Sequence, residues 1–282
     1  MTASDGRTFT DIEDFVDAVR DARIMLVVTS PGVFWARLAQ LTLPHLHLLA
    51  VSESLPRAAY IALSPEQVCV GFPLQVDSSS VWCGVRLQRG HIVFHSRAEH
   101  FHQRTNGPAE WGLISVDPQR LAATGLALTG QELVAPPSGR ILRPARRDIA
   151  RLLRLHAAAV RFVDKHPKLL LDPDVIRGMQ HDLLEALVGC LTSEFESHSD
   201  GREGHQRIMD RFEQVLAASS DLLMTVPQLC TNIGVSERTL RACCTEFLGI
   251  GPGGYLRLRR LRLARFALRA GRSTSGSVAE LA

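Results

Sequence analysis

The segment Leu229–Leu268, LCTNIGVSERTLRACCTEFLGIGPGGYLRLRRLRLARFAL, has a spacing of turn and apolar residues that predicts the fold of the C-terminal part. Gly234 is expected to end a first helix, because glycine adopts the left-handed conformation of a helix C-cap without strain. Ser236 is expected to begin a second helix by accepting a hydrogen bond from the amide of Thr239, and Gly249 to end it. Two helices joined by a turn this short form a helix-turn-helix.

A third helix is predicted to follow, because Pro252 is favourable in the first turn of a helix. Its apolar stripe is expected to face inward and comprises Leu258, Leu261, Ala264 and Leu268. Much of the remaining helix surface consists of Arg257, Arg259, Arg260, Arg262, Arg265 and Arg269. A basic amphipathic helix of this kind suits a nucleic-acid backbone, a membrane surface or an acidic partner.

The outward face of the second helix carries the candidate DNA contacts. In a helix-turn-helix the second helix enters the major groove, where residues near its N-terminus reach base edges. Arg238 and Arg241 lie three residues apart, and an arginine fork matches guanine O6 and N7 with about 1–3 kcal/mol of discrimination. The alternative is that these arginines are merely solvated. The predicted DNA-binding residues are Ser236, Glu237, Arg238, Thr239, Arg241, Ala242, Thr245, Arg257 and Arg260.

The charge of the chain is unevenly distributed. The segment Ser220–Ala282 contains nine arginines and four acidic residues, a net charge of +5, which leaves −2 for the rest of a chain whose total is +3. A basic end on a nearly neutral chain indicates a polyanionic partner for that end.

This C-terminal segment resembles the AraC/XylS family of transcription regulators. The family pattern, gaps included, is met by Ser236, Arg238, Leu240, Gly249, Pro252, Tyr255, Leu261 and Ala264. The chain departs from the pattern at Ala242, Cys244 and Gly251, where the family usually has arginine, phenylalanine, and serine or threonine. The resemblance implies a sequence-specific transcription regulator without enzyme activity or cofactor. Its implied partners are double-stranded DNA, a second copy in a homodimer, a small-molecule effector and RNA polymerase.

The resemblance also implies a second helix-turn-helix unit after the arginine-rich helix. Residues 277–282, SVAELA, are similar to its start, because Ser277 and Glu280 have the spacing of a capping box. The second unit is therefore expected to be truncated and the DNA-binding domain incomplete. Either the sequence is a fragment or a truncated gene product, or the protein binds DNA with half of the usual surface. In a further alternative, a truncated regulator acts only through mixed dimers with full-length relatives.

The N-terminal half has the pattern of a β domain. Between about residues 24 and 116, strands are predicted from the short apolar runs IMLVV, LHLLAV, AAYIAL, VCVGFPL, VWCGVRL, HIVFH and WGLISV, which turn residues separate. VRLQRGHIVF is interpreted as a hairpin with its turn near Arg89 and Gly90. Thr10 and Glu13 predict a capping box at the start of an earlier helix. The family resemblance implies a ligand-sensing, cupin-like β-barrel here.

The expected fold class is α+β, a cupin-like barrel with flanking helices followed by an all-α helix-turn-helix domain. Apolar spacing predicts helices near 149–163 and 175–191, which either cover the barrel or pair with another subunit. The expected organisation is a sensory barrel over 1–145, a dimerisation or connector segment over 146–195, a polar linker over 196–205 and the DNA-binding domain over 206–282.

A metal-dependent cupin-type enzyme is the alternative function. His91, His95, His100 and His102 lie within twelve positions, but only Glu110 follows them as a nearby carboxylate, and the distant histidine of such sites is missing. These histidines are therefore expected on the surface or in the hairpin, and neither metal ligands nor catalytic residues are predicted. Core positions rather than a pocket lining are expected for Trp35, Trp82, Trp111 and Phe94.

The cysteines and the N-terminus predict a cytoplasmic protein. The six cysteines form no C-x-x-C pair, and MTASDGRTFTDIEDF lacks the character of a secretory leader, so the thiols are expected to be reduced. No apolar run approaches the roughly 18 residues that cross a bilayer, so no membrane partner is expected.

Overall fold

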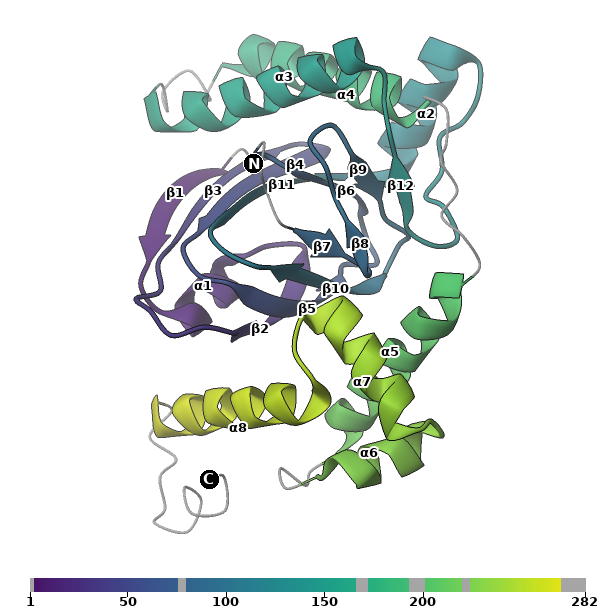
Figure 1. Cartoon of the computed structure of the whole chain (residues 1–282). Helices are drawn as coiled ribbons and strands as arrows, with labels where there is room; N and C mark the ends of the chain where they lie inside the picture. The colour runs from purple at the N-terminus through teal and green to yellow at the C-terminus, as the bar shows by residue number, and fades with distance from the viewer. Residues whose placement is uncertain (1–2, 76–79, 166–171, 193–200, 220–223, 270–282) are drawn as a thin grey trace.

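Two stacked antiparallel sheets form the centre of the molecule, and helices cover both outer faces (Figure 1). The computed structural model describes residues 3–75, 80–165, 172–192, 201–219 and 224–269. Across this part of the chain the fold is α+β, as the sequence predicted. The described strands form two separate sheets, however, and not the single closed sheet of the expected barrel.

The larger sheet has seven strands and mixes distant parts of the N-terminal half. In spatial order it contains β1 (Ala3–Phe9), β3 (Ala36–Leu43), β4 (Leu46–Glu53), β11 (Ala109–Val116), β6 (Val68–Pro73), β9 (Ile92–Phe94) and β12 (Arg140–Leu142). The smaller sheet has five strands, β2 (Ala22–Val28), β5 (Arg57–Leu63), β10 (His100–Thr105), β7 (Val81–Trp82) and β8 (Val85–Arg86). One apolar core fills the space between the sheets and includes Leu26, Ile61, Phe101, Trp82 and Trp111.

The N-terminal segment contains a strand that the sequence did not predict, before the helix that it did predict. Strand β1 comes first, and the short helix α1 (Ile12–Ala18) follows it. Its N-cap is Asp11, whose side chain accepts hydrogen bonds from the amides of Glu13, at 2.9 Å, and Asp14, at 3.3 Å. The predicted capping box of Thr10 and Glu13 is therefore wrong by one residue at the cap, because the aspartate carboxylate satisfies the amides there.

The predicted hairpin near Arg89 and Gly90 is also wrong. Strands β8 and β9 belong to different sheets, so the residues between them carry the chain from the smaller sheet to the larger one. Gly90 has a φ of +91°, a left-handed conformation that glycine adopts without strain.

Helices α2 (Pro118–Thr129), α3 (Arg146–Lys165) and α4 (Pro173–Leu191) lie against the outer face of the larger sheet (Figure 1). Their apolar sides share one core with that sheet, which includes Leu48, Val70, Phe72, Leu152 and Leu187. Helices α3 and α4 were predicted from the sequence. In the structure they cover the β domain, which is one of the two roles expected for them.

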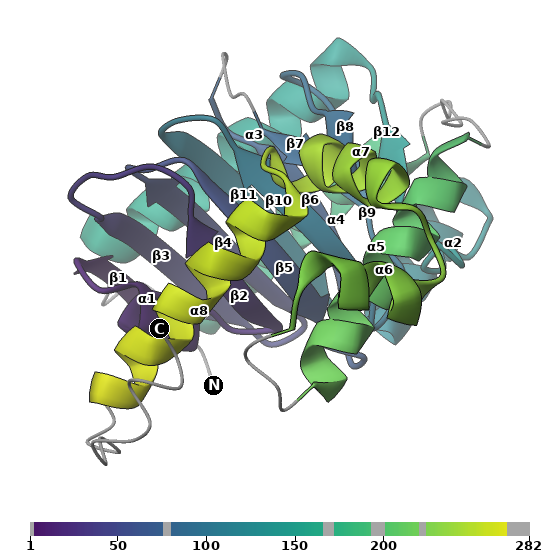
Figure 2. The same cartoon turned by 60° about the horizontal axis from the view of Figure 1, so that its bottom comes forward.

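Helices α5 (Gly201–Ala218), α6 (Val226–Ile233), α7 (Glu237–Leu248) and α8 (Pro252–Arg269) form a C-terminal unit on the outer face of the smaller sheet. Val27 of β2 and Ala58 of β5 belong to the core of this unit, so the sheet and the unit share buried surface. Figure 2 shows α8 extending along β2 toward α1. Helix α5 begins at Gly201, so the last five residues of the predicted linker, 196–205, are helical.

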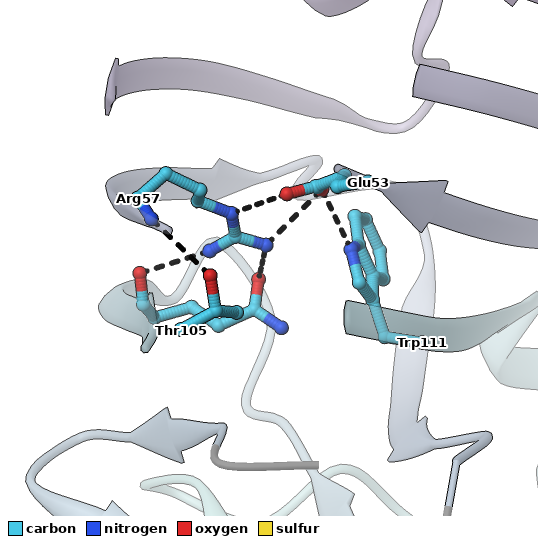
Figure 3. Close-up of polar contacts among 5 residues, drawn as sticks. Glu53, Arg57, Thr105 and Trp111 are labelled. Carbon is cyan, nitrogen blue, oxygen red and sulfur yellow. Dashed lines mark hydrogen bonds and ion pairs between the residues drawn. The ribbon is translucent and has the colours of Figure 1, made fainter. Parts of the chain in front are cut away.

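A buried polar cluster joins the two sheets where β4 leads into β5 (Figure 3). Arg57 donates from Nε to Glu53 Oε2 at 2.7 Å and from Nη2 to Glu53 Oε1 at 3.2 Å. The Arg57 guanidinium also donates to two oxygens of Gln103, the backbone oxygen at 2.9 Å and the side-chain Oε1 at 2.8 Å. Trp111 Nε1 donates to Glu53 Oε1 at 2.9 Å. Since Glu53 and Trp111 come from the larger sheet and Arg57 and Gln103 from the smaller one, the cluster ties the sheets together.

Within the described ranges, no helix combines the length and apolar composition needed to span a bilayer.

Candidate nucleic-acid interface

The turn between α6 and α7 has the geometry that the sequence predicted. Gly234 ends α6 with a φ of +79°, and its amide donates to the carbonyl of Cys230 at 2.9 Å. Ser236 is the N-cap of α7 and accepts a hydrogen bond from the amide of Thr239 at 3.1 Å. The two predicted helices and the turn between them are therefore present, with the predicted caps.

The start of α6 contains a capping box that sequence reasoning missed. The Thr225 hydroxyl accepts from the amide of Gln228, whose side-chain oxygen accepts from the Thr225 amide at 2.7 Å. The signal was present as T-x-x-Q directly before the apolar positions of α6.

The inward face of α7 is apolar and buried, as predicted. Leu240, Cys243, Cys244 and Phe247 are each no more than 1% exposed. Burial raises the pKa of the Cys243 thiol to about 11 and that of the Cys244 thiol to about 12. Both cysteines therefore remain neutral thiols and act as small apolar side chains in this core.

The outward face of α7 is open to solvent. Its exposed residues are Ser236, Glu237, Arg238, Arg241, Ala242 and Thr245, and Thr239 is half-buried beside the cap. Arg241 Nη2 donates to Glu237 Oε1 at 2.9 Å, and the two side chains are 66% and 54% exposed. An exposed pair of this kind contributes little, typically below about 1 kcal/mol, so a competing anion can displace the glutamate.

The apolar stripe predicted for α8 is wrong for two of its four members. Leu261 is 56% exposed and Leu268 is 50% exposed, while Leu258 and Ala264 are half-buried. The first half of α8 packs against the other helices of the C-terminal unit, and its second half contacts the N-terminal part. The helix therefore has no single apolar stripe that faces inward along its whole length. The rotation of a helix about its axis depends on such long-range contacts, which apolar spacing does not report.

The predicted backbone-contacting arginines of α8 occupy different environments. Arg257 is exposed. Arg260 is half-buried and donates from Nη2 to the carbonyl of Met224 at 2.9 Å, and Arg259 donates likewise to the carbonyl of Leu216 at 3.1 Å. Arg259 and Arg260 thus hold α8 against the ends of neighbouring segments.

A buried polar contact connects the β domain to the C-terminal unit. His102 on β10 and Tyr255 on α8 both contact Oε1 of Glu213 on α5, at 3.0 and 3.1 Å. All three side chains are buried. Burial and the nearby Glu213 carboxylate raise the pKa of Tyr255 well above its ordinary value, so its hydroxyl remains a donor. Nothing in the sequence pairs these residues, because each comes from a different element.

A second polar contact joins α8 to α1. Arg262 donates from Nε and Nη2 to the two carboxylate oxygens of Glu13, at 2.9 and 2.8 Å. One helical turn further along, Arg265 forms an ion pair with Asp11. Sequence reasoning did not predict these α1–α8 ion pairs, since 249 residues separate Glu13 from Arg262.

The histidine cluster does not have the predicted surface position. His91, His95 and His102 are buried, and only His100 is exposed among the four. His95 lies 3.0 Å from Glu99 through Nδ1 and stacks on Phe101 with ring centroids 4.3 Å apart. Among the described side chains, no three histidine, cysteine, aspartate or glutamate residues come together as a ligand set for a metal ion.

The aromatic predictions are confirmed for three of four residues. Trp82, Trp111 and Phe94 are buried in the cores, whereas Trp35 is 44% exposed. The predicted start of a second unit, Ser277 and Glu280, lies outside the described residues.

Comparisons with known proteins give distant similarities. No family model matches the chain. The chain is similar to the crystal structure of the AraC-like transcriptional activator CuxR, with a TM-score of 0.44 and 16% identity, over 99% of this chain and 100% of that chain. It is also similar to ToxT from Vibrio cholerae, with a TM-score of 0.31 and 11% identity, over 83% of this chain and 88% of that chain. ToxT bound to (E)-4-(8-methylnaphthalen-1-yl)but-3-enoic acid gives a TM-score of 0.31 and 10% identity, over 76% and 99% of the two chains. Similarity at these levels does not establish a family for this chain.

Proposed function

We propose that the protein is a sequence-specific DNA-binding transcription regulator of the AraC/XylS type, in which α7 enters the major groove. The observation that carries the proposal is the solvent-open face of α7 behind a capped turn, with Arg238 and Arg241 on the same exposed surface. Residues in the first turns of a recognition helix reach base edges, and an arginine there pairs with guanine.

The remaining predicted contacts have two roles in this proposal. Ser236, Glu237, Thr239, Ala242 and Thr245 accompany the two arginines on the surface of α7 that faces the bases. Arg257 and Arg260 belong to α8 and serve the phosphate backbone. Of these two, Arg257 is exposed and available, whereas Arg260 first has to leave the Met224 carbonyl.

The N-terminal part is proposed to control the C-terminal unit, by sensing an effector over residues 1–145 and by self-association through residues 146–195. Supporting self-association, the outer face of α3 carries exposed Arg154 and Arg161, while that of α4 carries exposed Asp182. These opposite charges on adjacent helices fit a second copy of the same chain turned about a two-fold axis. Measurement of the mass in solution by light scattering tests this part, and a monomer at all concentrations would contradict it.

Fluorescence anisotropy with promoter DNA from upstream of the gene tests the DNA-binding proposal. Arg238→Ala/Arg241→Ala is expected to lose at least tenfold in affinity, because each arginine–guanine pair is worth about 1–3 kcal/mol. The matched control is Arg89→Ala/Arg120→Ala, which removes two exposed arginines from the N-terminal part, outside α7, α8 and the helices proposed for self-association. Equal affinity of all three proteins, or binding that is indifferent to salt, would contradict the proposal.

A further inference from the structure

The arginines of α8 are mostly occupied by the protein itself. Of the five whose side chains the structure describes, Arg259 and Arg260 donate to backbone carbonyls, and Arg262 and Arg265 pair with carboxylates. The fifth of these described side chains, Arg257, is exposed, and neither kind of contact is described for it. The charge that makes α8 suitable for DNA is therefore largely masked in this conformation.

The pair between Arg262 and Glu13 has the geometry by which arginine binds a phosphate. Two parallel N–H groups, Nε and Nη2, donate to the two carboxylate oxygens at 2.9 and 2.8 Å. The same fork is used for bidentate contacts to phosphate oxygens, so one guanidinium edge cannot serve both anions at once. The side chains are 19% and 12% exposed, so a DNA backbone cannot approach this edge until α8 separates from α1.

The carboxylates that pair with α8 do not depend on it. Asp11 is the N-cap of α1, and its carboxylate also accepts from the amides of Glu13 and Asp14. Acidic side chains at a helix N-terminus are stabilised by the helix dipole in addition. Helix α1 can therefore release α8 without losing its own cap, as a reversible contact requires.

We infer that the α1–α8 ion pairs are an autoinhibitory contact, in which Asp11 and Glu13 occupy arginines that otherwise bind the DNA backbone. This inference rests on the proposed DNA-binding function. DNA binding and α1 compete for Arg262 and Arg265, so the N-terminal part lowers the affinity of the C-terminal unit for DNA. The recognition face of α7 remains open in both states, so the contact changes affinity and salt dependence more than the preferred base sequence.

The test uses the full chain with Asp11→Asn/Glu13→Gln, which removes both charges and keeps the shapes. Asparagine is as good an N-cap as aspartate, so α1 is expected to persist. The matched control is Glu66→Gln/Glu132→Gln, which raises the net charge equally at two exposed positions outside α1 and α8. The probe is a short fluorescein-labelled duplex of mixed sequence, because contacts to the phosphate backbone do not require the operator.

Release of two arginines is expected to steepen the plot of log affinity against log salt concentration by up to about 1.8, at about 0.9 per phosphate contact. The Asp11→Asn/Glu13→Gln variant should bind more tightly than wild type at low salt, and this advantage should shrink about tenfold between about 50 and 200 mM salt. Without DNA, its α8 amides should exchange hydrogen for deuterium faster than those of the control.

Three outcomes overturn the inference. If all three proteins bind the duplex with one affinity and one salt slope, the ion pairs do not compete with DNA, although the proposed function survives. If the control behaves as the Asp11→Asn/Glu13→Gln variant does, net charge and not the contact is responsible. If none of the proteins binds DNA at any salt concentration, the proposed function fails and the inference fails with it.

Discussion

Replacement of Arg57 by methionine tests how the two sheets are held together. In the wild type, Arg57 is 1% exposed and neutralises Glu53, which is 2% exposed (Figure 3). Arg57→Met leaves that buried carboxylate with the Trp111 indole as its one partner among the contacts described above, and also removes two donors from Gln103. Removal of one member of a buried ion pair typically lowers the free energy of unfolding by about 3–5 kcal/mol, which is the expected result.

The chain offers a matched control for this substitution. Glu237 and Arg241 also lie four residues apart, but they are 54% and 66% exposed. Arg241→Met is expected to change the free energy of unfolding by less than about 0.5 kcal/mol, because solvent already screens the pair. The difference between the two substitutions isolates the effect of burial.

Urea unfolding followed by tryptophan fluorescence measures both values, with the slope against urea concentration checked for each variant. The double variant Glu53→Met/Arg57→Met should be more stable than Arg57→Met alone, since it leaves no unpaired buried charge. A loss below about 1 kcal/mol for Arg57→Met would show that the cluster does not tie the sheets. A double variant less stable than the single one would contradict the argument from uncompensated charge.

Three further expectations concern the helices and their contacts. Tyr255→Phe should lower the free energy of unfolding by about 1.5–3 kcal/mol in urea titrations, because it removes a donor to the Glu213 carboxylate; Tyr60→Phe, at the only other tyrosine of the chain, serves as control and should cost less. Burial lowers the pKa of His156 from 6.5 to about 4. The unfolded chain therefore binds a proton that the folded chain does not between these values, so stability should fall as the pH drops through this window, by up to about 1.4 kcal/mol per pH unit. Urea midpoints across that range should depend less on pH in His156→Gln, and an unchanged dependence would contradict a neutral His156. Ser236→Ala should cost about 0.5–2 kcal/mol by thermal or urea unfolding through loss of the α7 cap, and no change would show that the cap contributes nothing.

The C-terminal helices were predictable because their boundaries depend on local chemistry. Gly234, Ser236, Gly249 and Pro252 act through backbone conformation and hydrogen bonds within a few residues, and each lies at the helix end where the sequence placed it. The arrangement of the outward α7 residues follows from the same boundaries. Because these signals act between neighbouring residues, they do not depend on how distant parts of the chain pack.

Strands β3 and β10 were missed because polar residues interrupt their apolar pattern. Gln40 of β3 is buried and donates to the carbonyl of Ala18 at 3.1 Å. His102 and Gln103 of β10 are buried through contacts with Glu213 and Arg57, which are distant in sequence. A buried polar residue is identified only when its partner is known, and the sequence does not reveal partners that lie 22, 46 and 111 residues away.

The orientation of α8 was mispredicted for a related reason. Its leucines and arginines allow several faces to be buried, and the choice depends on carboxylates of α1 near the other end of the chain. The exposed Leu261 and Leu268 are the consequence of that choice.

Selection of bound sequences from a pool of random DNA duplexes tests whether α7 reads DNA. The wild type is expected to enrich a defined motif that contains guanines, and Arg238→Ala/Arg241→Ala to lose the preference at those guanines while retaining salt-dependent binding. Enrichment of no motif by the wild type, or of the same motif by both proteins, would contradict the assignment of α7 as the recognition helix.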